Sequence, residues 1–78
     1  MNQKILFNDD ITFNKARSAW SFTGMLSGQL ITIFFHSKHL NTLQAIDENT
    51  QFDLEESVEL WLAENELEGT EIVIDCDN

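Results

Sequence analysis

The chain has 78 residues, of which 14 are acidic and 4 are Lys or Arg, so its formal net charge is −10 at pH 7. This length predicts a single small domain over residues 1–78, because domains typically run from about 50 to 200 residues. Hydrophobic residues make up 42% of the chain, too many for a disordered protein despite the charge. The single Cys excludes an internal disulfide and argues against a disulfide-stapled secreted scaffold.

The charges are distributed unevenly along the sequence. All four basic residues lie within residues 1–46, whereas residues 47–78 contain twelve acids and no Lys or Arg. A chain this acidic is repelled by nucleic acids and by anionic lipids, so we expect neither as a direct partner. The acids are interpreted either as a solvated face that maintains solubility or as a docking surface for a basic partner.

The first residues and the longest apolar run indicate the cellular compartment of the protein. The first ten residues lack the apolar stretch of a signal peptide. The longest apolar run is far shorter than the roughly 20 residues of a membrane helix. We therefore expect a cytoplasmic protein without a membrane span.

The first half of the sequence predicts a strand followed by a β-hairpin. Residues 5–7 form an apolar run that ends at turn-forming Asn and Asp, and residues 11–15 either continue as an extended arm or turn back. Residues 16–25 and 29–36 have the features of strands and flank Ser27-Gly28, which suits a two-residue turn. That register pairs Trp20 with Phe35 and Phe22 with Ile33, so one face of the hairpin is apolar.

The other face of this hairpin also carries large apolar residues. Met25, Leu30 and Phe34 alternate there with Ser and Thr. Two interpretations stay open: the chain's own N-terminal arm or a helix covers this face, or the face contacts another molecule.

Two helices are expected next. Leu40, Leu43 and Ile46 are three residues apart, which suggests a short helix that Ser37 caps and that ends near Asp47. A second helix is expected to begin at Asp53 or slightly earlier, with Asp53 as the cap of a capping box.

The second helix has one main apolar face and one weaker apolar face. Leu54, Val58, Trp61 and Leu62 follow helical spacing, and we expect them to pack on the apolar hairpin face. Leu60, Ala63 and Leu67 lie on the opposite side. Gly69 is a good stop for this helix.

The last segment is predicted to return to the sheet as a strand. Residues 70–76 are rich in β-branched side chains, and their partial alternation places Cys76 on the inner side. The order strand, hairpin, two helices and strand predicts an α+β domain with a small antiparallel sheet and the helices packed on one face.

Several of these segments together resemble one known family. They are the opening residues Met1 to Phe7, the hairpin from Trp20-Ser21-Phe22 to Ile31-Thr32-Ile33, the helix start Phe52-Asp53-Leu54-Glu55-Glu56 and the short final strand. The sequence resembles, over almost its whole length, the small proteobacterial family catalogued as domain of unknown function 1488. The resemblance implies a small cytoplasmic α+β domain of bacterial origin with no established activity, and it carries over no catalytic residue.

Few residues suggest chemistry. His36 and His39 could both reach one metal ion, but no further His and no second Cys exists, so polar junction residues are the preferred interpretation. Whether they bind a metal stays open. Cys76 is interpreted as an inert buried thiol, because the neighbouring acids would raise its pKa. We expect no catalytic residue, no cofactor and no enzymatic activity, because a fold this small forms only a limited pocket.

The sequence therefore favours a non-enzymatic protein–protein interaction domain that self-associates. The alternative is an acidic antagonist, or nucleic-acid mimic, that binds a basic site on a partner protein. The candidate interaction surface consists of eight apolar or acidic residues, namely Met25, Leu30, Phe34, Leu60, Leu67, Glu55, Glu59 and Glu66.

Overall fold

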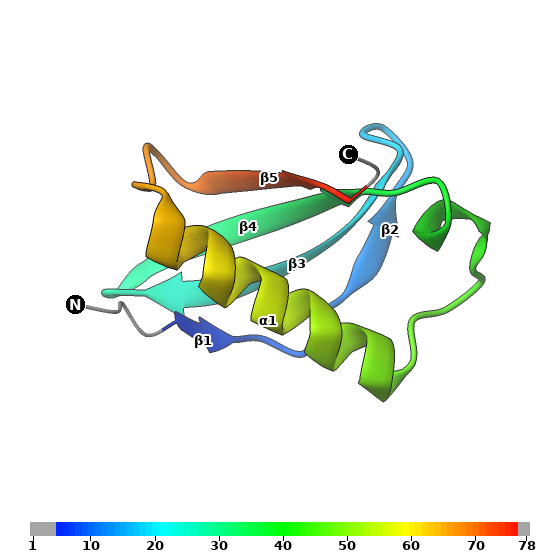
Figure 1. Cartoon of the computed structure of the whole chain (residues 1–78), viewed down its shortest axis with the longest axis horizontal. Helices are drawn as coiled ribbons and strands as arrows, with labels where there is room; N and C mark the ends of the chain where they lie inside the picture. The colour runs from blue at the N-terminus through cyan, green and yellow to red at the C-terminus, as the bar shows by residue number, and fades with distance from the viewer. Residues whose placement is uncertain (1–4, 77–78) are drawn as a thin grey trace.

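The computed structural model describes residues 5–76, which form one sheet and one long helix (Figure 1). The elements in chain order are β1 (Ile5–Phe7), β2 (Thr12–Asn14), β3 (Ala19–Leu26), β4 (Gln29–His36), the 3-10 turn η1 (Leu40–Thr42), α1 (Glu48–Glu64) and β5 (Glu71–Asp75). The opening residues Met1 to Lys4, which belong to the family resemblance, lie outside the described part.

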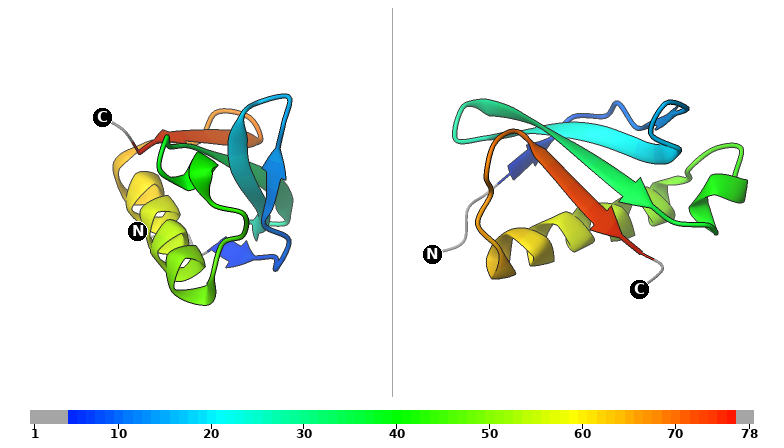
Figure 2. Two further views of the ribbon diagram at one scale, coloured as in Figure 1. Left: turned by 90° about the vertical axis from the view of Figure 1, so that its right-hand side faces the viewer. Right: turned by 90° about the horizontal axis from the view of Figure 1, so that it is seen from above.

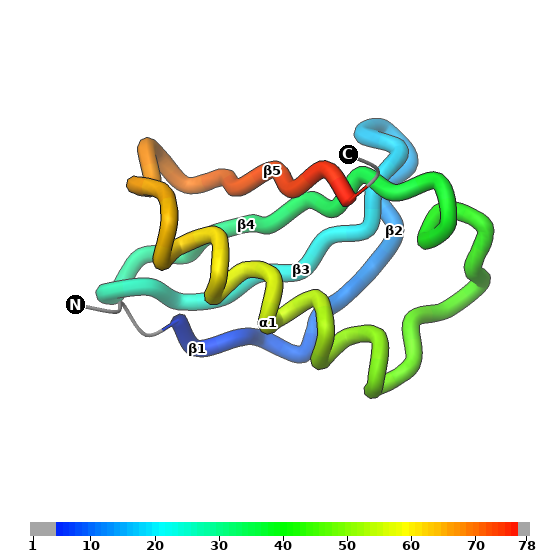
Figure 3. Tube along the Cα trace, viewed as in Figure 1, coloured from blue at the N-terminus to red at the C-terminus, as the bar shows by residue number. Residues whose placement is uncertain are grey.

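The sheet has the strand order β1-β3-β4-β5, and β2 also pairs with β3. β1 lies opposite the second half of β3 and β2 lies opposite its first half, so the two short strands share one edge of the sheet. Residues 12–14 thus continue extended in the direction of β1, and the chain turns back only at residues 15–18, before β3 begins. The tube in Figure 3 shows β5 along the other edge.

The predicted hairpin is confirmed in its register. Trp20 lies opposite Phe35 and Phe22 lies opposite Ile33, as the alternation requires. Ser27 and Gly28 join the strands with φ angles of 53° and 80°. A two-residue turn with positive φ at both positions matches the right-handed twist of the flanking strands.

Helix α1 packs on one face of the sheet (Figure 2). Leu54 and Val58 are buried in the core, and Trp61 and Leu62 are half-buried against it. The predicted inner face of the helix is therefore confirmed. The buried core residues of the strands are Ile5, Trp20, Phe22, Leu26, Ile31, Ile33, Phe35 and Ile72.

The structure has one helix where the sequence predicted two. Between Ser37 and Asp47 only the 3-10 turn η1 forms, although the Ser37 hydroxyl does accept the Leu40 N–H at 3.2 Å. The carbonyl oxygen of Leu40 accepts the Leu43 N–H and the Trp20 indole N–H. Leu43 then adopts an extended backbone conformation, with φ −83° and ψ 142°, so the helical turn ends there.

Helix α1 begins earlier than predicted. The Asp47 carboxylate accepts the Thr50 N–H at 2.7 Å and caps the helix, so Asp53 lies within α1 and not at its start. The helix also ends earlier, at Glu64, because the Asn65 backbone is extended with φ −132° and ψ 153°, and the Asn65 side-chain amide donates to the Trp61 carbonyl at 3.0 Å. Gly69 has a φ of 91°, but it lies in the connection to β5 and does not stop the helix.

The last strand differs from the prediction in two respects. β5 is parallel to β4, because α1 carries the chain back to the starting end of β4 before β5 begins. The sheet is therefore mixed and not purely antiparallel. Cys76 follows the end of β5 and is exposed, so the predicted burial of this thiol is wrong.

Candidate interaction surfaces

The face of the sheet opposite α1 is called the open face. Strand alternation places Leu6, Met25 and Leu30 there side by side, since Met25 lies opposite both Leu6 on β1 and Leu30 on β4. Leu6 is 70% exposed and Leu30 is 53% exposed, whereas Met25 between them is half-buried. These three side chains, the apolar row, form a continuous apolar strip across three strands.

Phe34 also lies on the open face, but it does not contribute an exposed ring. It retains only 5% exposure, because the Arg17 guanidinium stacks over its ring at 4.1 Å from the centroid. Arg17 in turn forms an ion pair with Glu71 at 3.5 Å. The expectation of Phe34 as an exposed contact residue is therefore wrong, because the turn between β2 and β3 provides the cover.

The middle of the open face is polar. The Asp10 carboxylate accepts the backbone N–H of Thr23 at 2.9 Å and also its hydroxyl, and the Asn8 side-chain amide donates to the same hydroxyl at 2.8 Å. Between β1 and β2, the Asp10 carboxylate thus accepts the Thr23 N–H in place of the backbone carbonyl of a neighbouring strand. Its role is to hold the connecting loop on β3, in agreement with the turn chemistry expected from the sequence.

The outer side of α1 forms a separate surface. Leu60 is 65% exposed and Glu59 is exposed, whereas Glu55 is half-buried. Phe52, which was not among the predicted contact residues, is 61% exposed on the same helix. Phe52 and Leu60 are eight residues apart, which is about 12 Å along the axis, so they do not form one patch. Phe52 does not share the helical spacing of the residues that face the core. An aromatic residue at such a position was the sequence signal for its exposure.

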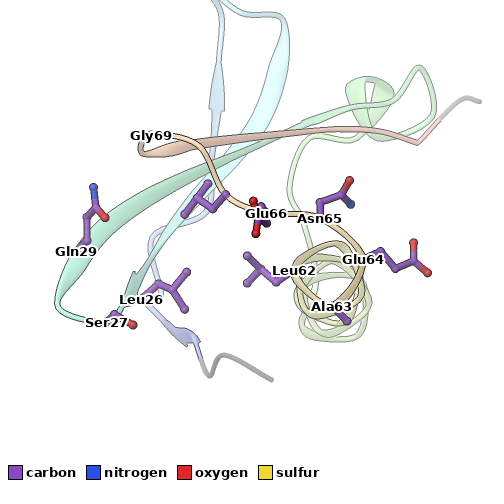
Figure 4. Close-up of a pocket in the computed structure, with 10 residues that line it drawn as sticks. Leu26, Ser27, Gln29, Leu62, Ala63, Glu64, Asn65, Glu66 and Gly69 are labelled. Carbon is purple, nitrogen blue, oxygen red and sulfur yellow. The ribbon is translucent and has the colours of Figure 1, made fainter. Parts of the chain in front are cut away.

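A groove of about 670 Å³ lies between the end of α1 and the turn that joins β3 to β4. Figure 4 shows Leu26 and Leu62 directed toward each other across it, with Glu66 on the connection that follows the helix. Leu67 also lines the groove, but it is half-buried and packs against the core. The expectation of Leu67 as a freely exposed contact residue is therefore wrong.

The eight predicted contact residues do not form a single surface. Met25 and Leu30 lie on the open face of the sheet, Leu60 and Glu59 belong to the helix on the opposite face, and Glu66 lies at one end of the domain. The helix and the sheet separate these groups, which a one-dimensional pattern could not reveal.

Helix α1 is strongly acidic. It contains six carboxylates and no Lys or Arg, and no basic residue occupies its last turn. At its start, the hydrogen bond from the Thr50 backbone N–H, reinforced by the Thr50 side chain, lowers the pKa of Asp47 below its usual value of 3.8. This cap retains its charge and satisfies an otherwise unpaired amide of the first turn.

The possible metal ligands do not gather. His36 is half-buried on β4 opposite Asp75, whereas His39 is exposed just before η1. Within residues 5–76, no group of three or more His, Cys, Asp or Glu side chains is placed to hold a metal ion.

In the same part of the chain, no helix is long and apolar enough to cross a bilayer.

Comparison with known proteins gives one informative similarity. No family model and no curated protein matches the sequence. The structure is similar to a crystal structure of a protein of unknown function from the DUF1488 family of Shewanella loihica PV-4, with a TM-score of 0.70 and 26% sequence identity. The alignment covers 95% of this chain and 94% of that chain. This likeness over almost the whole length of both proteins supports the resemblance of the chain to the DUF1488 family.

Proposed function

We propose that this protein is a non-enzymatic, cytoplasmic protein–protein interaction domain that self-associates through the open face of its sheet. The apolar row carries this proposal. Leu6 and Leu30 are each more than half exposed and flank Met25 in the same cross-strand row. Contiguous apolar side chains on an open sheet gain free energy when a second surface covers them.

Two features limit where a second copy would bind. Arg17 and Glu71 occupy the part of the open face around Phe34 with charged groups. The apolar row lies at the other end, near the turn between β3 and β4. A two-fold contact centred on this row would place apolar side chains against apolar side chains, with the polar group around Thr23 at the rim.

Light scattering on the purified protein over a wide concentration range tests this proposal. The mass should rise above the 9.0 kDa of one chain as concentration increases, and added salt should change it little because the contact is apolar. Leu30→Lys should keep the protein at the mass of one chain. Leu60→Lys is the matched control, since it places the same charge on a similarly exposed Leu of α1 and should associate like the unmodified chain.

Two outcomes would contradict the proposal. One is a mass of 9.0 kDa for the unmodified chain at every concentration. The other is loss of association in Leu60→Lys with retention in Leu30→Lys, which would place the contact on the helix.

The second candidate function is an acidic antagonist that binds a basic site on another protein. The exposed carboxylates of α1, among them Glu59, favour it, because this helix has no basic residue of its own. Such a complex should dissociate as salt screens its charges, whereas a contact through the apolar row should not. A pull-down at low and high salt distinguishes the two, with Glu55→Gln/Glu59→Gln as the variant that should lose only the salt-sensitive partner.

A further inference from the structure

β5 lies at the edge of the sheet and, among the described strands, pairs with β4 alone. The Thr32 N–H donates to the Thr70 carbonyl and the Cys76 N–H donates to the His36 carbonyl, each at 2.9 Å. In a parallel pair, alternate residues of a strand bond to its neighbour. Thr70, Ile72, Ile74 and Cys76 therefore face β4, while the backbone N–H and C=O groups of Glu71, Val73 and Asp75 point to the outer edge.

The same three outward residues present an acidic–apolar–acidic pattern on the open face. Glu71 and Asp75 are exposed, and Val73 between them is 48% exposed. Edge strands often carry charges that prevent uncontrolled pairing with another sheet. The charges on β5 disfavour pairing with another acidic strand and permit pairing with a basic strand.

Pairing of β5 with a second copy of itself is unfavourable. A two-fold antiparallel pair centred on Val73 would place Glu71 of each copy opposite Asp75 of the other. Like charges directly opposite each other destabilise a strand pair, and here the repulsion would occur twice. A second copy is therefore not the occupant of this edge, and self-association through the apolar row is a different contact.

We propose that the outer edge of β5 binds an extended basic segment of another protein. The segment adds a strand to the sheet by backbone hydrogen bonds to Glu71, Val73 and Asp75. Its Lys or Arg side chains face Glu71 and Asp75, and an apolar side chain between them faces Val73. The net charge of −10 attracts such a segment over a distance.

The ion pair between Arg17 and Glu71 does not block this docking. Both side chains are partly exposed, at 42% and 54%, and the closest nitrogen–oxygen distance is 3.5 Å. Exposed ion pairs of this kind contribute little to stability, so a cation of the partner can share or replace Arg17 at small cost.

The experiment uses a labelled, end-capped peptide of sequence Lys-Thr-Val-Thr-Lys, with binding followed by fluorescence anisotropy and by amide NMR shifts. The basic peptide should bind and shift the amides of Glu71, Val73 and Asp75. The acidic peptide Glu-Thr-Val-Thr-Glu should not bind. A basic peptide that is N-methylated at alternate residues keeps its charge but cannot form the strand pair, and it should bind far more weakly.

The matched variants are Val73→Pro and Val73→Ile. Pro is tolerated on an edge strand where its N–H would face outward, so Val73→Pro should fold and yet bind the basic peptide about tenfold more weakly, through loss of one backbone hydrogen bond. Val73→Ile should bind like the unmodified chain. The double variant Glu71→Lys/Asp75→Lys retains the repulsion between copies and should reverse the preference, binding the acidic peptide and not the basic one.

Three results would overturn the proposal. They are the absence of basic-peptide binding at low salt, equal binding of the N-methylated peptide, and unchanged binding in a folded Val73→Pro. If Val73→Pro does not fold, the N-methylated peptide and the double variant decide the question. None of these results depends on the oligomeric state, which tests the apolar row separately.

Discussion

The indole N–H of Trp20 donates a buried hydrogen bond of 2.8 Å to the carbonyl oxygen of Leu40. This bond links the middle of the sheet to η1, twenty residues further along the chain. Leu40 itself is buried in the core. A core aromatic residue therefore fastens the connection between β4 and α1 to the sheet.

Trp20→Phe should destabilise the fold by about 1–3 kcal/mol, because the ring is shortened and the buried Leu40 carbonyl loses one donor. Urea unfolding measures the loss. Trp61→Phe is the control, since Trp61 is only half-buried on α1 and should lose clearly less stability. Equal losses in the two variants would show that the bond to Leu40 contributes nothing.

Gly24→Ala should weaken the contact between β1 and β3. A Cβ atom at this position would lie 2.9 Å from two side-chain atoms of Ile5 and 3.1 Å from the Leu6 carbonyl oxygen. Ile5 is buried and cannot withdraw freely, so we expect a loss of about 1–3 kcal/mol from overpacking. Hydrogen exchange should accelerate first at the β1 amides, and unchanged exchange there would contradict the expected clash.

Moderate salt should stabilise the protein. Glu55 and Glu59 are four residues apart on α1, and like charges at this spacing cost a few tenths of a kcal/mol per pair. Salt screens this repulsion, so the urea midpoint should rise when NaCl is added. Glu59→Gln removes one member of the pair and should reduce the rise. A midpoint that falls with salt would show that attractive charge pairs dominate.

Acid should weaken the start of α1 through Asp47. The hydrogen bond from the Thr50 backbone lowers the pKa of Asp47 in the folded state below the 3.8 expected when unfolded. Its contribution is therefore complete above the unfolded pKa and is lost as the pH falls through the lower folded pKa. In an acid titration followed by helical circular dichroism, Asp47→Asn should lack this component, because Asn caps without titrating. An identical acid profile for both proteins would contradict this role of the carboxylate.

Features that depend on neighbouring residues could be predicted from the amino-acid pattern alone. The alternation of Trp20 and Phe22, and that of Ile33 and Phe35, defines the buried face of the hairpin, and Ser27-Gly28 fixes its register. The spacing of Leu54, Val58 and Trp61 likewise defines the inner face of α1. Each of these patterns extends over only a few neighbouring residues. The order of apolar and polar side chains is therefore enough to predict it.

How the segments cover one another could be seen only in the folded chain. The sequence pattern favoured Asp53 as the cap, but Asp47 begins α1, and only the 3-10 turn η1 forms between β4 and this helix. Phe34 is buried by Arg17, and the parallel placement of β5 follows from the path of α1 across the sheet. These outcomes depend on contacts between residues far apart in the chain, so they follow from packing and have no local signature in the sequence.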